Sequence, residues 1–114
     1  MPFISTRTNK AIDEKVSAEL KSARGKAITA IPGKSESWLM VENTGNCDLY
    51  FKGKNDGTIV FSEVKIFGTA SNSAYDALTS ELTKIYVDIL GADADKVYIK
   101  YEEVEHWGWN GNNF

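Results

Sequence analysis

The stretches PGKSESWLMVE (Pro32–Glu42) and LGADADKVYIKYE (Leu90–Glu102) decide the fold of this chain. In each of them, a glycine that can end a helix precedes a run of residues that is typical of a strand. The two glycines, Gly33 and Gly91, are 58 positions apart, so the chain divides into two repeating halves at about 1–56 and 57–114. We therefore predict a single domain over residues 1–114 in which each half forms a strand–helix–strand unit.

Apolar residues at steps of three and four precede both glycines. The first predicted helix starts at about Ala11 and ends at Pro32-Gly33, because both residues interrupt a helix. In the second half, Ser73–Asp76 resembles a capping box and Gly91 is the expected stop. The positions at helical spacing are Ile12, Val16, Leu20, Ala23, Ala27 and Ile31, then Ala74, Leu78, Leu82, Ile85 and Ile89.

Strand character is found in four main segments and one short one. The segments are Phe3–Arg7, Trp38–Val41, Thr58–Phe67 and Val97–Tyr101, with Leu49–Phe51 as a short edge strand. Together the elements predict an α+β fold with a four-stranded mixed sheet, two helices on one face and short edge strands. The other face is left bare, so it is either polar or covered by other subunits. The apolar run Trp38–Val41 favours covering, and hence an oligomer.

Composition argues against several classes of function. The formal net charge of −3 with dispersed acidic residues argues against a nucleic-acid partner, which requires clustered lysine and arginine. Cys47 and His106 are the single cysteine and the single histidine, so we expect no intrachain disulfide and no metal site, and nothing places them together as a nucleophile and base. The N-terminal segment lacks the pattern of a signal peptide and no run approaches about 18 apolar residues, so we expect a cytoplasmic protein with no membrane partner.

The N-terminus offers one chemical possibility. Met1 is followed by Pro2, and a small second residue favours removal of the methionine. Pro2 would then carry a free secondary amine, which is a rather strong base on a rigid ring. Taken alone, a proline at position two also has many ordinary explanations.

Five short segments carry a resemblance to a known family along the whole chain. They occur in order, at matching separations and on the same strand–helix–strand pattern: Met1-Pro2, Pro32–Lys34, Lys65–Gly68, Val97–Ile99 and Trp107–Phe114. With these segments the chain resembles the macrophage migration inhibitory factor and D-dopachrome tautomerase family. The resemblance implies a homotrimer whose three sheets face inward as a barrel, which would cover the bare sheet face.

The resemblance also implies a site that transfers a proton alpha to a carbonyl, with no cofactor and no metal. Pro2 corresponds to the base, and Lys34 to a lysine that meets the substrate carboxylate and disfavours protonation of Pro2. The backbone N–H of Ile66 corresponds to a donor to the substrate, and Tyr98 to a tyrosine of the neighbouring subunit. The other implied substrate-binding residues are Phe3, Lys65, Lys100, Trp107, Trp109 and Phe114, of which Trp109 and Phe114 form an aromatic wall.

Lys65, Lys100 and Trp107 depart from the family pattern. If both lysines point into the pocket beside Lys34, the site favours dianionic or strongly acidic substrates and the pKa of Pro2 is lowered further. Alternatively, both lysines tilt outward and pair with Glu63 or Glu102.

The expected function is therefore a keto–enol tautomerase that acts on phenylpyruvate-like aryl 2-oxo acids. The extra lysines leave open a second enzymic alternative, in which the same proline hydrates or decarboxylates an unsaturated or 3-oxo acid. A third alternative is a cytokine-like binding protein or host-factor mimic with a protein receptor and vestigial tautomerase activity. Because some family members are secreted by a non-classical route, secretion also stays open.

Overall fold

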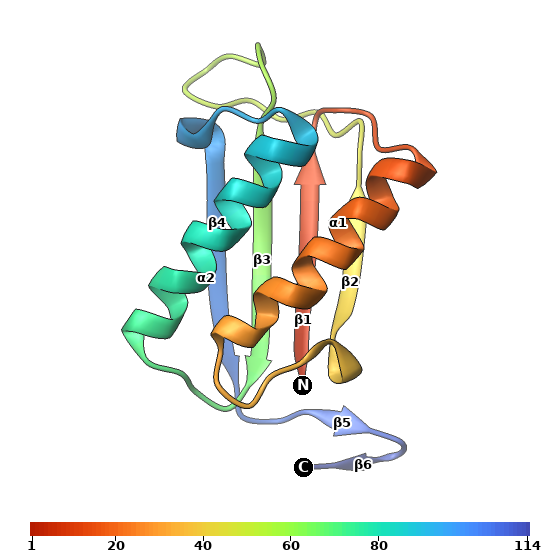
Figure 1. Cartoon of the computed structure of the whole chain (residues 1–114), viewed down its shortest axis with the longest axis vertical. Coiled ribbons are helices and arrows are strands. Elements are labelled where there is room, and N and C mark those ends of the chain that lie inside the picture. The colour runs from red at the N-terminus through yellow and green to blue at the C-terminus, as the bar shows by residue number, and fades with distance from the viewer.

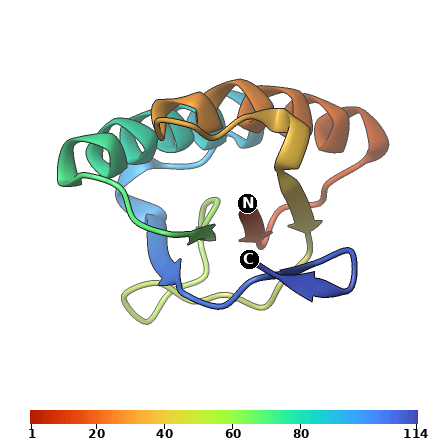
Figure 2. The same ribbon diagram turned by 90° about the horizontal axis from the view of Figure 1, so that it is seen from below.

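Two helices lie side by side across one face of a four-stranded sheet in the computed structural model, which describes residues 1–114 (Figure 1, Figure 2). The strands are β1 (Pro2–Thr8), β2 (Met40–Thr44), β3 (Val60–Phe67) and β4 (Val97–Val104), in the order β2-β1-β3-β4. β1 is parallel to β2 and antiparallel to β3, and β3 is parallel to β4. The mixed sheet built from two strand–helix–strand units confirms the predicted fold.

The first helix, α1 (Glu14–Ala27), begins three residues later than the sequence pattern predicts. Asp13 is its N-cap, and the Asp13 carboxylate accepts the Val16 N–H at 2.8 Å. This bond satisfies one of the donors that every helix start leaves free. A 3-10 turn over Ile28–Ala30 then leads to the predicted end at Pro32-Gly33, where Gly33 has a φ of 81°.

The second helix, α2 (Asn72–Ile85), continues as a π-helical turn over Tyr86–Leu90. Its N-cap is Ser71, whose hydroxyl accepts the Ala74 N–H at 3.1 Å, so the predicted capping box at Ser73–Asp76 was wrong. Serine is a good N-cap at position 71 and at position 73, and only the conformation of the preceding backbone decides which of the two begins the helix. The predicted stop at Gly91 is confirmed, because Gly91 has the left-handed φ of 71° that glycine adopts at low cost.

Three short segments differ from the sequence predictions. Trp38 ends a 3-10 turn over Glu36–Trp38, so β2 starts only at Met40. Leu49–Phe51 forms no strand, and Phe51 makes a single bridge to Lys54. The aromatic tail instead forms a hairpin of β5 (Gly108–Trp109) and β6 (Asn112–Asn113) around Asn110-Gly111, both with positive φ. Such an Asn-Gly pair is typical of a tight hairpin turn.

The core lies between the sheet and the two helices. It is built from the helix stripes and from one face of β1 and β3, and its fully buried members include Ile4, Leu20, Ile28, Val64, Leu78 and Leu82. None of the helices is long and apolar enough to cross a membrane.

The sheet face away from the helices is charged. Glu63 in β3 contacts Arg7 at 3.4 Å and Lys100 at 3.9 Å, and Lys100 contacts Glu102 at 3.0 Å. The same face exposes Met40 of β2 and Tyr98 of β4, so in the single chain it is partly polar and partly apolar. An assembly that covered this face would bury both its ion pairs and its exposed apolar side chains.

Candidate functional site

Pro2 is the first residue of β1 and is buried at the lower end of the sheet, opposite Ile66 of β3. The residue next to Ile66 reaches past the end of β1, because the Phe67 N–H donates to the Met1 carbonyl at 3.0 Å. The chain termini lie near one another in this region (Figure 1, Figure 2). The predicted base therefore lies at the N-terminal end of β1, next to the end of β3.

Lys34 reaches the same place from the turn that follows Gly33. Its ammonium donates to the Phe67 carbonyl at 3.0 Å, and its backbone N–H donates to Ile31 at 3.1 Å. Partial burial lowers the pKa of the Met1 α-amine, and the charge of Lys34 and a hydrogen bond with it lower that pKa further. An amine at this end of β1 is therefore biased toward its neutral, basic form.

An aromatic cluster adjoins Phe67. The Phe67 and Phe114 rings are 5.5 Å apart, and Phe114 stacks on Trp109 at 6.2 Å with planes 12° apart. Trp38 meets Trp109 edge-on at 5.0 Å. Because Trp38, Trp109 and Phe114 are each about half exposed, they form an accessible apolar wall rather than core packing.

The β5–β6 hairpin brings the tail to this wall. The Phe114 N–H donates to the Trp107 carbonyl at 3.0 Å, which closes the hairpin beyond the two-residue strands. Trp107 itself is half-buried next to the hairpin. The two wall residues of the tail are thus held near Phe67 by a turn that local sequence encodes.

Phe67 and Trp38 are the two residues of this region that sequence reasoning missed. Phe67 was quoted only as part of a motif, although its backbone contacts Lys34 and Met1 and its ring contacts Phe114. Trp38 was predicted to lie in a buried strand. The Ser-Glu-Ser composition just before it is typical of a turn and could have placed its side chain outside the sheet.

Tyr98 lies toward the opposite end of the sheet from Pro2, and Lys100 lies midway along it, in register with Glu63 and Ser5. Across the sheet, Pro2 is in register with Ile66 of β3 and Glu103 of β4. Tyr98 of β4 is in register with Phe61 of β3 and Arg7 of β1. Five residues of β4 separate Tyr98 from Glu103, or about 16 Å of strand. Tyr98 is 60% exposed and packs edge-on against Phe51 at 5.3 Å. Within one chain, Tyr98 therefore lies too far along the sheet to join Pro2, and Lys100 is directed to Glu102 and Glu63.

The extra lysines behave differently from one another. Lys100 is paired with Glu102 and Glu63. The hydrogen bond with Glu102 and the charge of Glu102 raise the pKa of Lys100, and the hydrogen bond with Lys100 and the charge of Lys100 lower the pKa of Glu102. Lys65 makes no ion pair, and its ammonium lies 6.0 Å from the centre of the Phe3 ring on the charged face of the sheet. Of these two lysines, Lys65 is thus the one without a carboxylate partner.

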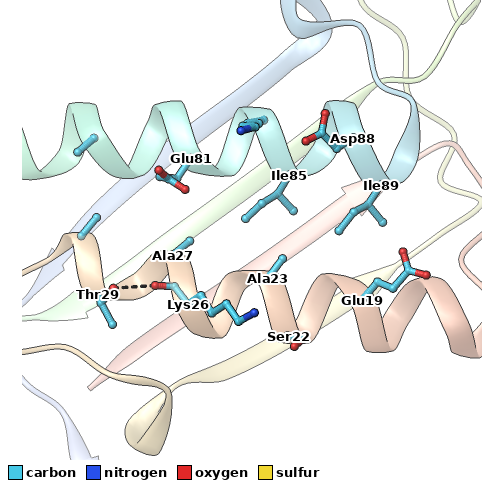
Figure 3. A pocket seen from close by; sticks show the side chains of 13 residues that line it. Glu19, Ser22, Ala23, Lys26, Ala27, Thr29, Glu81, Ile85, Asp88 and Ile89 are labelled. Atoms are coloured by element: carbon cyan, nitrogen blue, oxygen red, sulfur yellow. Dashed lines mark hydrogen bonds between the residues drawn. The ribbon is translucent and has the colours of Figure 1, made fainter.

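The largest cavity lies far from these residues, in a groove of about 750 Å³ on the outer surface between α1 and α2 (Figure 3). Ala23, Ala27, Ile85 and Ile89 line it, with charged side chains such as Glu19 and Asp88 at its rim. It shares no residue with the predicted site. A smaller hollow of about 390 Å³ includes Phe67, but no cavity of the single chain is lined by Pro2 or Lys34.

Comparison with known proteins gives one consistent result. The family model described as "Macrophage migration inhibitory factor (MIF)" matches residues 1–114. A protein described as "Macrophage migration inhibitory factor homolog" from Trichuris trichiura is 26% identical over 116 residues, which cover 100% of both chains. The crystal structure of Leishmania major MIF2 superposes with a TM-score of 0.93 at 26% identity, over 100% of this chain and 97% of that one. A homologue structure from Prochlorococcus marinus has a TM-score of 0.88 at 24% identity over 98% of each chain, which supports the fold alone.

Proposed function

Because the chain belongs to the macrophage migration inhibitory factor family, whose model matches its full length, we propose that it is a keto–enol tautomerase acting on aryl 2-oxo acids such as phenylpyruvate. The observation that carries this proposal is the position of Lys34. Its ammonium lies 3.0 Å from the Phe67 carbonyl, beside the start of β1. Partial burial there lowers the pKa of the Met1 amine, and the charge of Lys34 and a hydrogen bond with it lower that pKa further. A neutral amine next to a cation can accept a proton from an anionic substrate.

In the proposed mechanism, Met1 is removed and the Pro2 nitrogen becomes the base. During ketonisation, Pro2 takes the proton of the enol hydroxyl and the O–H electron pair forms the carbonyl. The C=C electron pair then takes that proton from Pro2 and forms the new C–H bond at the neighbouring carbon. Lys34 binds the substrate carboxylate, and Trp38, Trp109 and Phe114 pack against the aryl group. Apolar walls exclude water and so strengthen the electrostatic contacts inside the site.

The proposed active form is a homotrimer in which a neighbouring chain supplies Tyr98 to each site. Two observations support it. Tyr98 is well exposed and lies a sheet's length from Pro2 of its own chain, and no cavity of the single chain contains Pro2. A closed symmetric assembly can bring the two ends of different sheets together.

Replacement of Pro2 tests the enzyme proposal. Pro2→Gly should lower the rate of phenylpyruvate enol ketonisation, followed by ultraviolet absorbance, by about 100-fold or more, since it removes the positioned base. A form that retains Met1, identified by intact mass, should be equally slow because its Pro2 nitrogen is an amide. Circular dichroism of both forms controls for folding. Full activity in the Met1-retaining form would exclude Pro2 as the base.

The two other functions make different predictions. The hydratase or decarboxylase alternative depended on extra lysines, and Lys100 is already held by Glu102 and Glu63. Faster turnover of short unsaturated or 3-oxo acids than of arylpyruvates would nevertheless favour it. Undiminished binding of a protein receptor by the Pro2→Gly variant would favour a cytokine-like or mimic role in which catalysis is vestigial.

A further inference from the structure

Lys65 is a half-buried lysine whose charge no other part of the chain neutralises. Its ammonium makes no ion pair and lies over the Phe3 ring, 6.0 Å from the ring centre. Lysine stems pack on apolar surface in this way while the charged head stays free for another partner. The proposed tautomerase mechanism assigns no task to this charge.

The carboxylate beside Lys65 is already occupied. Glu102 of β4 is in register with Lys65, but the Glu102 carboxylate contacts the Lys100 ammonium at 3.0 Å. The hydrogen bond and charge of Lys100 are the main causes of the lowered pKa of Glu102, and the charge of Lys65 is the smallest. Lys100 also reaches Glu63 at 3.9 Å. A negative group that binds Lys65 must therefore come from outside this sheet.

Lys65 lies next to the predicted base. In the antiparallel pairing of β1 with β3, Pro2 is opposite Ile66, the residue between Lys65 and Phe67. The Lys34 ammonium donates to the Phe67 carbonyl at 3.0 Å. Lys34 and Lys65 thus meet β3 on either side of the predicted base, at residues about 7 Å apart along the strand.

Lys65 also shares a face of β3 with the Phe67 ring. Side chains two residues apart on a strand point to the same side of the sheet. The Phe67 ring lies 5.5 Å from Phe114, which stacks on Trp109. An aryl group packed against this aromatic wall therefore has the ammonium of Lys65 on its own side of the sheet.

On the basis of the proposed tautomerase function, we propose that Lys65 determines specificity for substrates with two carboxylates. Lys34 binds the carboxylate next to the 2-oxo group, and Lys65 binds a second carboxylate on the aryl group. The hollow of about 390 Å³ beside Phe67 presents Glu103 and Glu105, whose charges repel the second carboxylate and leave it to Lys65. A contact between two charged groups is stronger than a neutral hydrogen bond. Dicarboxylic 2-oxo acids are therefore better substrates than phenylpyruvate itself.

Three substrates that differ only in the charge at the para position test the proposal on the full-length protein with Met1 removed. They are 4-carboxyphenylpyruvate, phenylpyruvate and 4-(trimethylammonio)phenylpyruvate, and ultraviolet absorbance follows the ketonisation of each enol. For the wild type, kcat/KM should be roughly tenfold higher for the 4-carboxy compound than for phenylpyruvate, mainly through KM, and lowest for the cationic compound. This preference should shrink severalfold in about 0.5 M salt, which screens the charges.

Substitution of Lys65 separates its charge from the intrinsic reactivity of the three substrates. Lys65→Met should remove the preference for the 4-carboxy compound, and Lys65→Glu should make the cationic compound the better of the two charged ones. Lys15→Glu, at an exposed residue of α1, changes the net charge as much as Lys65→Glu and should keep the wild-type order. Circular dichroism controls for folding. The wild-type order in Lys65→Met, or a reversed order in Lys15→Glu, would overturn the inference.

Binding of unreactive analogues judges Lys65 without turnover. Benzoylformate and 4-carboxybenzoylformate have no hydrogen next to the oxo group and cannot enolise, and calorimetry gives their Kd. The dicarboxylate should bind the wild type about tenfold more tightly than benzoylformate does, and Lys65→Met should abolish this difference. Equal Kd values in the wild type beside an inactive Pro2→Gly variant would overturn this inference and leave the tautomerase proposal standing. Full turnover by Pro2→Gly beside a tenfold difference that depends on Lys65 would overturn the tautomerase proposal and support the second carboxylate site.

Discussion

Arg24 is a fully buried guanidinium without a carboxylate partner. It donates to the Leu20 carbonyl at 3.1 Å, to the Thr6 hydroxyl at 2.9 Å and to the Asn43 side chain. Burial lowers the pKa of Arg24, whereas the nearby Tyr86 hydroxyl raises it. Several neutral acceptors thus replace the counter-ion, which makes the surrounding polar network costly to break.

The Tyr86 hydroxyl joins this network to β3, and its removal measures the value of the network. It lies 2.7 Å from the Thr6 hydroxyl and 2.8 Å from the Ser62 hydroxyl, all buried. Tyr86→Phe should lower the free energy of unfolding in urea by about 1–2 kcal/mol, because buried groups lose a partner. Tyr50→Phe is the control at a mostly exposed tyrosine, and it should change stability by less than about 0.5 kcal/mol. Equal losses in both variants would show that the buried network contributes nothing.

At the scale of elements, local sequence was enough to predict that both helices and all four strands of the sheet are present. Periodicity located α1 and α2, and Gly91 ended the second helix as predicted. The first residues of the helices were less predictable. Asp13 and Ser71 act as N-caps because the backbone is extended at these residues, and helical periodicity does not reveal where the extended backbone ends. Arg24 shows a deeper limit: it lies one turn after Leu20 on the buried face, but its charge removed it from the predicted stripe.

The end of the π-helical turn depends on the left-handed conformation of Gly91. A Cβ at position 91 would meet only the Lys10 ammonium at 3.7 Å, so a substitution there would destabilise the fold through backbone strain and not through a steric clash. Gly91→Ala should lower the free energy of unfolding by about 1–2 kcal/mol. Gly91→Asn should lose less, because asparagine adopts this conformation more readily than alanine. Both variants are compared by urea unfolding. An alanine variant at least as stable as the asparagine one would contradict this account of the stop.

At the scale of the whole molecule, the residues predicted from the family resemblance fall into two groups. Pro2, Lys34, Trp109 and Phe114 gather around Phe67, whereas Lys100 lies midway along the sheet and Tyr98 toward its other end. No local pattern could reveal this separation, because it depends on the register between strands that are far apart in sequence. Phe67 was missed for the same reason, whereas the Ser-Glu-Ser turn before Trp38 was a local signal for that residue. In the proposed trimer, a neighbouring chain would supply Tyr98 to the site that contains Pro2.

Mixing of two inactive variants tests whether the site is shared. Pro2→Gly removes the base and Tyr98→Ala removes the residue that the neighbour is proposed to supply, so each homotrimer should be slow. Unfolded together in equal amounts and refolded, they should form mixed trimers in which about a quarter of the sites pair an intact Pro2 with an intact Tyr98. Phenylpyruvate turnover should then rise toward a quarter of the wild-type rate, whereas variants refolded apart and mixed afterwards should give only the sum of their residual rates. Tyr98 is 60% exposed in its own chain, so its loss should leave the fold of the chain intact. If the co-refolded sample is no faster than the control mixture while native mass spectrometry shows that mixed trimers have formed, Tyr98 does not act across the interface.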